Sequence, residues 1–370
     1  MTDLTIKAVE AIPYCIPYRK PLRFASGEVT HASHVLVRVH TEGGLFGTAD
    51  APPRPFTYGE TQRGVVAVIE SIFEPALVGL DATRRELVRE RLGRTVGNPV
   101  AKAAIDMALW DVLGQAWSTP VSRILGGYTD RMRVSHMLGF DTPEVMVDEA
   151  TRMRDRYGIT TFKVKVGRRP IDADVEVVRA LRQSLGDKAE LYIDGNRGWT
   201  AAESARALRQ LEDVGLTLAE ELCPADDVLG RRWLVNQTTV PFVADESAAT
   251  PAEVTRELLA GSATAVSIKT SRTGFSGSSE VLDLARGLGV DVVMGNQIDT
   301  QLGTACTVVF GCAHAASARR AGELSNFLDM SDDLLTEPLA IVDGSMEVPT
   351  RPGIGVAVDP DKLAHYRTDA

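Results

Sequence analysis

The sequence predicts an α/β protein in which a (β/α)₈ barrel follows a smaller α+β unit. Beyond about residue 133, eight short apolar runs alternate with amphipathic segments, and the charged residues that end five successive runs lie 24 to 29 positions apart. A strand and its crossover helix need about 25 to 30 residues to return to the same edge of a parallel sheet. Before residue 133, strands are followed by a run of helices, which is typical of a separate α+β unit.

The N-terminal part begins with strand-like segments. An apolar segment at 5–18 and a loop containing Gly and Ser at 19–33 lead into a second apolar run at 34–50. Gly43 and Gly44 interrupt that run, which predicts a hairpin turn at this point.

Three parts of the chain are therefore expected. Helical periodicity between about residues 60 and 125 completes an α+β domain at 1–128, and the barrel spans 129–335. The remaining segment, 336–370, is β-like again and is expected to return to the first domain.

The eight apolar runs are the expected barrel strands. They are RVSHMLGF (133–140), TFKVKVG (161–167), ELYIDGN (190–196), LTLAEELC (216–223), VPFVADES (240–247), TAVSIKT (264–270), VDVVMGN (290–296) and GELSNFL (322–328). The last is the weakest, because the residues before it, 303–322, give a poor helical pattern.

Composition argues against several functional classes. The chain has 370 residues, 44% of them hydrophobic, and a formal net charge of −10 without blocks of Lys or Arg, so we expect no nucleic-acid partner. The opening residues MTDLTIKAVE lack the basic and apolar segments of a secretion signal, and no apolar run reaches about 18 residues. We expect a cytoplasmic protein without a membrane partner.

The cysteines do not indicate a metal site or a disulfide. Cys15, Cys223, Cys306 and Cys312 lie far apart except for the last pair, whose spacing is unusual for zinc. We interpret all four as reduced core thiols.

Lys163 and Lys165 stand two positions apart in an expected buried strand. Side chains alternate between the faces of a strand, so both lysines share one face while Phe162 and Val164 share the other. Two solvated lysines at a strand exit are one interpretation. In a barrel, however, the apolar face packs on the helices, and both ammonium groups then enter the interior, which requires anions or a function to compensate.

Carboxylates follow the next three strands of the expected barrel. Asp194, Glu220 and Asp245 each end an apolar run. Each alone is most simply a helix N-cap. Three on consecutive strands converge at the carboxyl end of a barrel, where active sites form, and they repel one another unless a cation lies among them. Oxygen ligands favour Mg²⁺ or Mn²⁺ over zinc; a structural Ca²⁺ site is the alternative, but it leaves the lysines unexplained.

Lys165 and Lys269 lie on the second and sixth expected strands and would flank whatever is held at the centre. A proton α to a carboxylate is weakly acidic, and a divalent cation stabilises the resulting enediolate. Lys163 and the cation would lower the pKa of Lys165 and make it a usable acid or base near neutral pH. Pairing of a Lys base with Mg²⁺ is a known feature of enolase-superfamily sites.

At these residues the sequence resembles the mandelate racemase/muconate lactonizing enzyme group of the enolase superfamily, and its muconate lactonizing branch in particular. The resemblance covers nearly the whole chain and includes AKAAIDMALWDVLGQAWSTPVSRILGG, KVK, YIDGN, AEELCPADD, VADES and SIKTSRTG. It implies a modified TIM (β/α) barrel with an α+β N-terminal capping domain, and a homo-oligomer. It also implies site residues: Asp194, Glu220 and Asp245 binding Mg²⁺ or Mn²⁺, the acid/base pair Lys165 and Lys269 with Lys163 beside them, and Glu323 at the eighth strand.

The sequence departs from the family pattern in two places. The family usually has Pro two residues after the metal-binding Glu, whereas Leu222 stands here and Pro224 follows. Glu220 rather than Glu221 is still the ligand that the resemblance implies. The seventh strand reads MGNQID, without the His–Asp dyad of the racemase type, and offers Asn296 and Asp299 as substrate contacts.

Two loops of the capping domain are expected to set specificity, at 19–29 and 51–60. Their cations could receive a second, distal carboxylate and their aromatic residues could shape the pocket; the candidates are Lys20, Arg23, Phe24, Arg54 and Tyr58. The alternative is that these cations are solvated. His31 and His34 are expected at the surface.

The resemblance implies a muconate cycloisomerase, an isomerase of aromatic hydrocarbon catabolism acting on a small dicarboxylate. Other reactions through an enediolate remain alternatives: an epimerase or racemase of dipeptides or N-acyl amino acids, an o-succinylbenzoate synthase, or a sugar-acid or hydroxyproline dehydratase. A non-catalytic carboxylate-binding protein is the alternative of another class.

Overall fold

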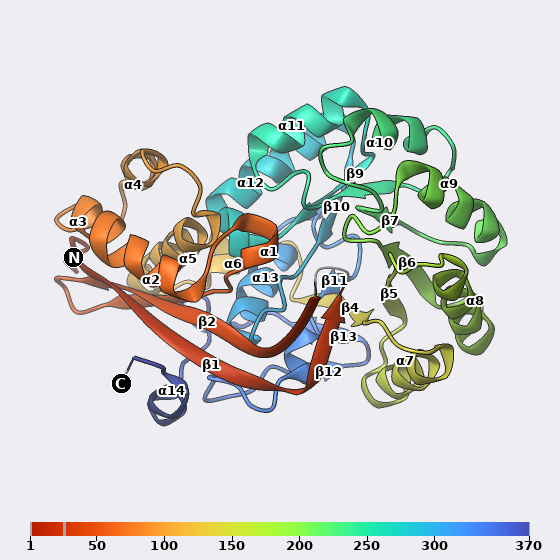
Figure 1. Cartoon of the computed structure of the whole chain (residues 1–370). Helices are drawn as coiled ribbons and strands as arrows, with labels where there is room; N and C mark the ends of the chain where they lie inside the picture. Colours follow the sequence, from red (N-terminus) through yellow and green to blue (C-terminus); the bar gives the residue numbers. More distant parts are fainter. Residues whose placement is uncertain (1, 25–26, 370) are drawn as a thin grey trace.

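The computed structural model describes residues 2–24 and 27–369. A small sheet with a group of helices lies on one side, and a barrel ringed by helices lies on the other (Figure 1). The expected α/β architecture, a TIM-type barrel with an α+β capping part, is confirmed.

The capping sheet is antiparallel, in the order β1 (Ile6–Phe24), β2 (Gly27–Thr41), β3 (Phe46–Ala51). The turn between β2 and β3 contains Gly43 and Gly44, as expected. The expected loop at 19–33 is wrong, because β1 and β2 pair as far as Phe24 opposite Gly27 with only register shifts along the way. Alternation of apolar side chains on this long ribbon, not its Gly and Ser content, decides its structure.

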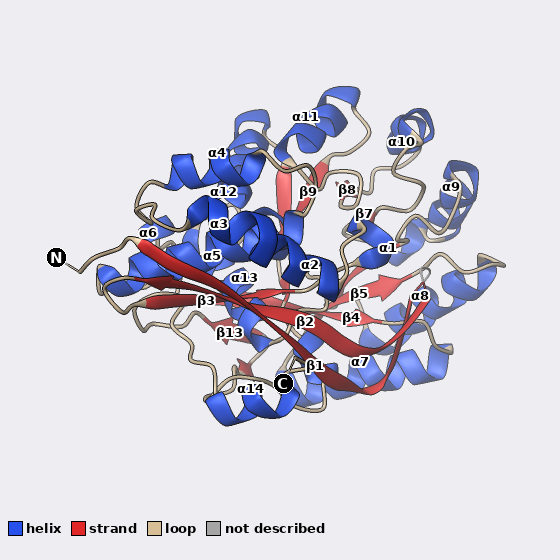
Figure 2. Cartoon of the chain, turned by 60° about the vertical axis from the view of Figure 1, so that its left-hand side comes forward, coloured by secondary structure: helices blue, strands red, loops and turns tan. Residues whose placement is uncertain are grey.

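Helices cover one face of the capping sheet (Figure 2). The helices that contact the sheet are α2 (Gln62–Val68), the π-helix η1 (Ile69–Phe73), α3 (Glu74–Leu77) and α5 (Pro99–Ala116). The others in this part are α1 (Pro55–Tyr58), α4 (Arg85–Gly93), which packs on α3, and α6 (Val121–Leu125), which packs on α5. Gly47 of β3 lets α5 approach closely, since a Cβ there would lie 1.9 Å from the carbonyl oxygen of Ala108.

The barrel is a parallel sheet that begins at β4. Its strands are β4 (Arg131–Leu138), β5 (Thr161–Lys165), β6 (Glu190–Asp194), β7 (Ala219–Glu220), β8 (Phe242–Ala244), β9 (Ala265–Ile268), β10 (Asp291–Met294) and β11 (Gly322–Glu323). The first seven pair in chain order, and β11 pairs with β4 on its other side. These are the eight expected runs, and the last is indeed only two residues long.

The connecting helices surround the strands (Figure 1). They are α7 (Pro143–Tyr157), α8 (Asp172–Leu185), α9 (Ala201–Gln210), η2 (Glu212–Val214), α10 (Val228–Val235), α11 (Pro251–Ala260), α12 (Thr270–Leu288), α13 (Gln301–Ala313) and η3 (Asn326–Asp329). Thr200 and Thr250 begin α9 and α11 with capping boxes. The poor helical pattern at 303–322 becomes α13, which is buried along its whole length and therefore lacks a polar face.

The C-terminal segment touches both parts of the molecule. Its strands β12 (Ile341–Val342) and β13 (Ser345–Glu347) form a hairpin, and β13 runs antiparallel to β4 of the barrel. Its helix α14 (Pro360–Tyr366) lies near β1, where the amide of Thr368 donates to the carbonyl of Pro13.

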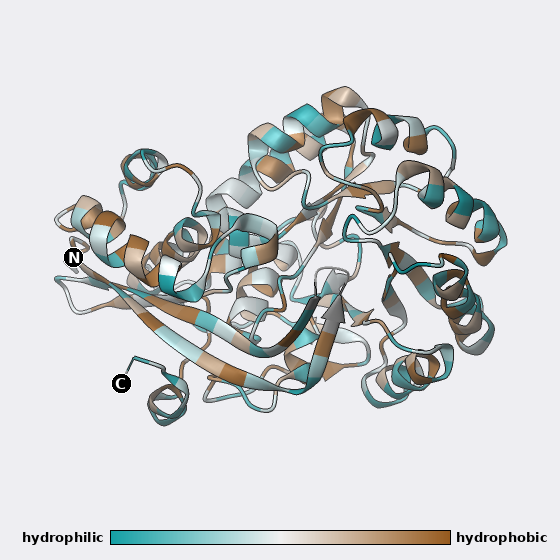
Figure 3. Cartoon of the chain, in the orientation of Figure 1, coloured by the Kyte–Doolittle hydropathy of each residue, from teal (hydrophilic) through white to brown (hydrophobic). Residues whose placement is uncertain are grey.

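The core follows the strands and the inner faces of the helices. In Figure 3 hydrophobic residues gather on the barrel strands, and hydrophilic ones mark outer helices such as α8 and α9. Phe162 and Val164 are fully buried in this core, so Lys163 and Lys165 point to the barrel interior, as the alternation predicted. Among the described residues the cysteines are free thiols, with Cys15 half-buried and the others buried. Nowhere in residues 2–24 and 27–369 does a helix combine the length and apolar character needed to span a bilayer.

Candidate active site

A cavity of about 440 Å³ opens at the carboxyl ends of the barrel strands, beneath the capping domain. Capping-domain residues on its wall include Tyr18, His34, Arg54 and Tyr58. Barrel residues on its wall include Lys163, Lys165, Asn196, Asp245, Glu246, Lys269, Asn296, Gln297, Glu323 and Asn326. The cavity therefore combines cations from both parts of the chain with carboxylates from the barrel.

Lys163 gathers three carboxylates around one ammonium group. Its Nζ lies 2.8 Å from Asp194 Oδ2, 2.8 Å from Glu220 Oε1 and 2.7 Å from Glu323 Oε1. Asp194 and Glu220 are level in the register of β6 and β7, and both are fully buried. Burial alone would lower the pKa of Lys163, but the three anions outweigh it and hold this pKa well above its usual range.

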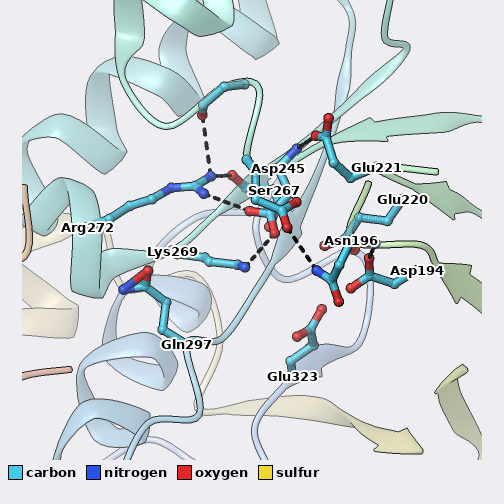
Figure 4. A network of polar contacts seen from close by, with 12 residues as sticks. Asp194, Asn196, Glu220, Glu221, Asp245, Ser267, Lys269, Arg272, Gln297 and Glu323 are labelled. Atoms are coloured by element: carbon cyan, nitrogen blue, oxygen red, sulfur yellow. Dashed lines mark hydrogen bonds and ion pairs between the residues drawn. The ribbon is translucent and has the colours of Figure 1, made fainter. Parts of the chain in front are cut away.

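Lys165 and Lys269 each contact one of the outer carboxylates. Lys165 Nζ lies 2.5 Å from Asp194 Oδ2 and 2.6 Å from Asn196 Oδ1. Lys269 Nζ lies 2.5 Å from Asp245 Oδ2, and Figure 4 shows this contact. The pull of Asp245 outweighs desolvation and raises the pKa of Lys269, which is therefore a protonated group facing the cavity.

The pKa values of the three carboxylates are shifted in different directions. Burial raises the pKa of each, but the lysines bring Asp194 to about 2, and Lys269 with Arg272 lowers the pKa of Asp245 further. For Glu220, burial and the neighbouring anions win over Lys163, and its pKa lies well above the usual range. The charge of Lys163 therefore does not fully offset the burial of Glu220 and the repulsion from its neighbouring carboxylates.

The donor set suits a hard divalent cation. Asp194, Glu220 and Asp245 are fully buried carboxylates from adjacent strands, and Glu220 Oε2 has no hydrogen-bond partner among the described residues. Lysine ammonium groups stand between these carboxylates, and within the described part of the chain no group of three or more His, Cys, Asp or Glu side chains is gathered closely enough to hold a metal ion.

Several expected substrate contacts lie elsewhere. Lys20 pairs with Glu149 at 2.9 Å and lines a separate, smaller cavity beside Phe140. Asp299 does not line the main cavity: the chain turns at Ile298, where φ is 60°, and carries Asp299 into full burial near Asp50, which raises its pKa to about 6. The prediction for Asp299 was wrong because the position of a strand end does not reveal the turn that follows it. The prediction for Lys20 was wrong because its ammonium group pairs with Glu149 instead of facing the main cavity.

Arg54, Tyr58 and Asn296 do line the cavity, as expected. The side chains of Arg23 and Phe24 lie outside the described part of the chain, so those two expectations stand as predictions. Arg54 Nη2 is buried without a hydrogen-bond partner among the described residues, and Tyr58 accepts a hydrogen bond from Arg272 at 2.9 Å.

His34 is not at the surface, contrary to the expectation, whereas His31 is exposed. His34 is 2% exposed and lines the cavity, with Nδ1 3.0 Å from Asp50 Oδ2. Asp50 also accepts from Tyr14 and Thr300, at 2.7 and 2.9 Å. His34 shares one face of β2 with the fully buried Leu36, and this alternation could have indicated that His34 faces inward.

Arg272 and Glu246 are further charged residues of the site. Prediction from the sequence missed them because it considered only the charged residue that ends each expected strand. Arg272 Nη1 lies 2.7 Å from Asp245 Oδ1, from the first turn of α12, and Figure 4 shows it on the far side of Asp245 from Asp194. Glu246 Oε1 accepts from Asn196 Nδ2 at 2.9 Å. Both stand close in sequence to predicted site residues, within SIKTSRTG and VADES.

Comparison with known proteins assigns both parts of the chain to one family. Residues 8–126 match the profile of the mandelate racemase/muconate lactonizing enzyme N-terminal domain, and residues 145–362 match the enolase C-terminal domain-like profile. The chain belongs to the mandelate racemase/muconate lactonizing enzyme family. Within the enolase superfamily it falls in the muconate lactonizing group, and it is an isomerase.

Individual members of the family are similar over almost their whole length. A muconate lactonizing enzyme from Mycobacterium smegmatis, solved in complex with muconolactone, is 68% identical with a TM-score of 0.98, covering 99% of this chain and all of that one. Muconate cycloisomerase 1 of Rhodococcus opacus is 30% identical over 98% of each chain. An L-Ala-D/L-Glu epimerase of Bacillus subtilis is 29% identical over 95% of this chain and 97% of its own.

Proposed function

We propose that this protein is a muconate cycloisomerase, which converts cis,cis-muconate to muconolactone. The observation that carries the proposal is the arrangement of cations in one cavity: Lys165 and Lys269 on opposite sides of the barrel, and Arg54 on the capping side. A dicarboxylate needs a cationic site at each end and a proton donor between them. The 68% identity to a muconate lactonizing enzyme supports the same substrate.

Asp194, Glu220 and Asp245 are the residues proposed to hold a divalent cation, Mg²⁺ or Mn²⁺. Members of the enolase superfamily generally use such an ion. When bound, it supplies positive charge that stabilises the anion developing on the substrate's proximal carboxylate.

The chain's own residues then carry the proton. One oxygen of the distal carboxylate bonds to the β carbon of the double bond that is conjugated with the proximal carboxylate, and the electron pair of that π bond moves to the carbon α to the proximal carboxylate. Lys165 gives its proton to this α carbon and recovers one from solvent. The substrate dianion takes up one proton from solvent overall, through Lys165, and becomes a monoanion. Written as free acids, substrate and product have the same atoms, so the reaction is an isomerisation.

Lys269 approaches from the other side as a fixed positive charge. Its raised pKa suits electrostatic stabilisation, and it becomes the acid if substrate binds in the opposite orientation. Lys163 holds Asp194, Glu220 and Glu323 together and offsets part of their charge.

Arg54 and His34 are proposed to receive the distal carboxylate. Arg54 has a buried nitrogen without a partner among the described residues, and Asp50 orients the ring of His34 on the same wall. A carboxylate bound there would satisfy a buried donor that is otherwise costly. Tyr58 and Asn296 complete the wall.

Turnover tests the proposal directly. Full-length protein with Mn²⁺ and cis,cis-muconate should remove the diene absorbance at a rate that rises with enzyme concentration. Protein that is folded and binds Mn²⁺ but leaves the absorbance unchanged would refute the assignment.

A dipeptide epimerase is the second candidate, since two lysines facing one cavity from opposite sides suit proton removal from one face and return to the other. The Bacillus subtilis epimerase, at 29% identity, is about as similar to this chain as the Rhodococcus opacus cycloisomerase at 30%. Incubation with L-Ala-L-Glu in D₂O would show deuterium at the α carbon for an epimerase and none for a dedicated cycloisomerase.

Other expectations stay predictions. These are the division of the chain at residues 128 and 335, the cytoplasmic location and the homo-oligomeric assembly.

A further inference from the structure

Glu221 follows Glu220 directly, yet its side chain points away from Lys163 and enters a separate buried network. Its Oε2 accepts from the backbone amide of Asp245 at 2.8 Å and from Ser247 Oγ at 2.9 Å. Figure 4 shows the Glu221 carboxylate turned away from Glu220 and Asp194, toward the segment that carries Asp245. One side chain thus ties the end of β7 to the end of β8.

Arg231 of α10 holds the other side of this carboxylate. Its Nη1 lies 3.2 Å from Glu221 Oε1 and 3.0 Å from the carbonyl oxygen of Ala225. Its Nη2 pairs with Glu257 of α11 at 2.5 Å. Arg231, Glu221 and Glu257 are at most 4% exposed, so this network fixes the loop against the outer helices without solvent.

The network holds the backbone of Glu221 in an unusual conformation. Its φ is 38°, in the left-handed region that non-glycine residues seldom adopt. Its amide donates to Val243 at 3.1 Å and its carbonyl accepts from the amide of Arg197 at 2.7 Å. This turn lets two successive glutamates face opposite ways, Glu220 to Lys163 and Glu221 to Asp245.

We propose that Glu221 is a positioning residue that fixes the Asp245 backbone relative to Glu220, and that Arg231 holds Glu221 in this role. The inference rests on the metal-binding role proposed above for Glu220 and Asp245. This role is more than structural support. The Glu221 carboxylate accepts a hydrogen bond from the backbone of Asp245, one proposed ligand, and Glu221 directly follows Glu220, another proposed ligand. Such outer partners orient metal ligands and affect metal affinity.

The test is Mn²⁺ affinity, measured by electron paramagnetic resonance on chelator-treated full-length protein. Glu221→Ala should weaken Mn²⁺ binding by about 10- to 100-fold. Glu221→Gln should weaken it less, because the amide oxygen can still accept from Asp245 while the ion pair with Arg231 is lost. The second variant carries the test if the first does not fold.

Asp111→Asn is the matched control. Asp111 is also a buried carboxylate that accepts two backbone amides from separate segments, those of Thr48 and Ile354 at 2.9 and 2.8 Å, but it lies in the capping domain. It should lower the unfolding midpoint and leave Mn²⁺ affinity unchanged. Folded Glu221 variants with wild-type Mn²⁺ affinity would overturn the inference alone. Wild-type protein that binds no Mn²⁺ would overturn the proposed metal site as well.

Discussion

Lys165 and Lys269 face the same cavity from β5 and from the end of β9, four strands apart in the sheet, and each contacts a different carboxylate, Asp194 or Asp245. A substrate held between them meets an ammonium group on each side. Both lysines can therefore reach a substrate at the centre, from opposite faces, and the reaction decides which of them transfers the proton.

Replacement of each lysine should separate the two candidate reactions. Lys165→Ala should lower kcat for cis,cis-muconate by about 10²- to 10⁴-fold, the usual contribution of a general acid, and Lys269→Ala should lower it less. Steady-state kinetics with Lys188→Ala, an exposed lysine, as control measures both. Equal losses in the two variants would favour an epimerase-like use of both lysines.

Arg54→Met should raise KM for cis,cis-muconate by about 10- to 100-fold while kcat stays within a few-fold, because a lost hydrogen bond between charged groups costs about 1.5–3 kcal/mol of binding. Lys20→Ala is the control, since Lys20 is paired with Glu149 beside another cavity. A rise in KM for Lys20→Ala with none for Arg54→Met would place the distal carboxylate at the other cation.

Glu149 should stabilise the fold in a pH-dependent manner. Burial raises its pKa, but His136 and Lys20 outweigh this and lower it from 4.5 to about 2. This stabilisation is present above about pH 4.5 and is lost as the pH falls toward 2, because the unfolded state then takes the proton first.

Glu149→Gln should therefore lower the free energy of unfolding at pH 7 by about 3 kcal/mol, at about 1.4 kcal/mol per pKa unit. Urea denaturation should show the difference from wild type shrinking between pH 5 and pH 3. A difference that is the same at both pH values would mean that Glu149 acts through packing alone.

Gly47→Ala should destabilise the capping domain by about 3 kcal/mol or more, because its Cβ would overlap the backbone carbonyl oxygen of Ala108 in α5. Gly93→Ala, at the end of α4 with open space around its Cβ, should be neutral or stabilising by about 0.5–1 kcal/mol. Thermal unfolding of both variants gives the comparison, and equal midpoints would contradict the close approach of β3 and α5.

The sequence was most informative where periodicity and strand ends decide the structure. Alternation around Lys163 and Lys165 predicted two inward lysines, and regular spacing predicted that Asp194, Glu220 and Asp245 lie on neighbouring strands; the structure places them so. These features depend on local pattern alone.

Features that depend on long-range contacts could not be predicted in this way. Residues 19–24 continue β1 because β2 lies beside them, which their Gly- and Ser-containing surroundings do not reveal. His34 is drawn inward by Asp50, and Lys20 outward by Glu149, from partners 16 and 129 positions away. Turn geometry at Ile298 and Glu221 likewise decides whether Asp299 and Glu221 reach the cavity.

The most direct test of the central claim is proton NMR of the product formed by wild-type protein and Mn²⁺ from cis,cis-muconate in D₂O. The proposed mechanism predicts muconolactone carrying one deuterium on the carbon α to its free carboxylate, with product formation nearly abolished in Lys165→Ala. Muconolactone without deuterium at that carbon, or formed at the wild-type rate by Lys165→Ala, would contradict proton transfer from Lys165.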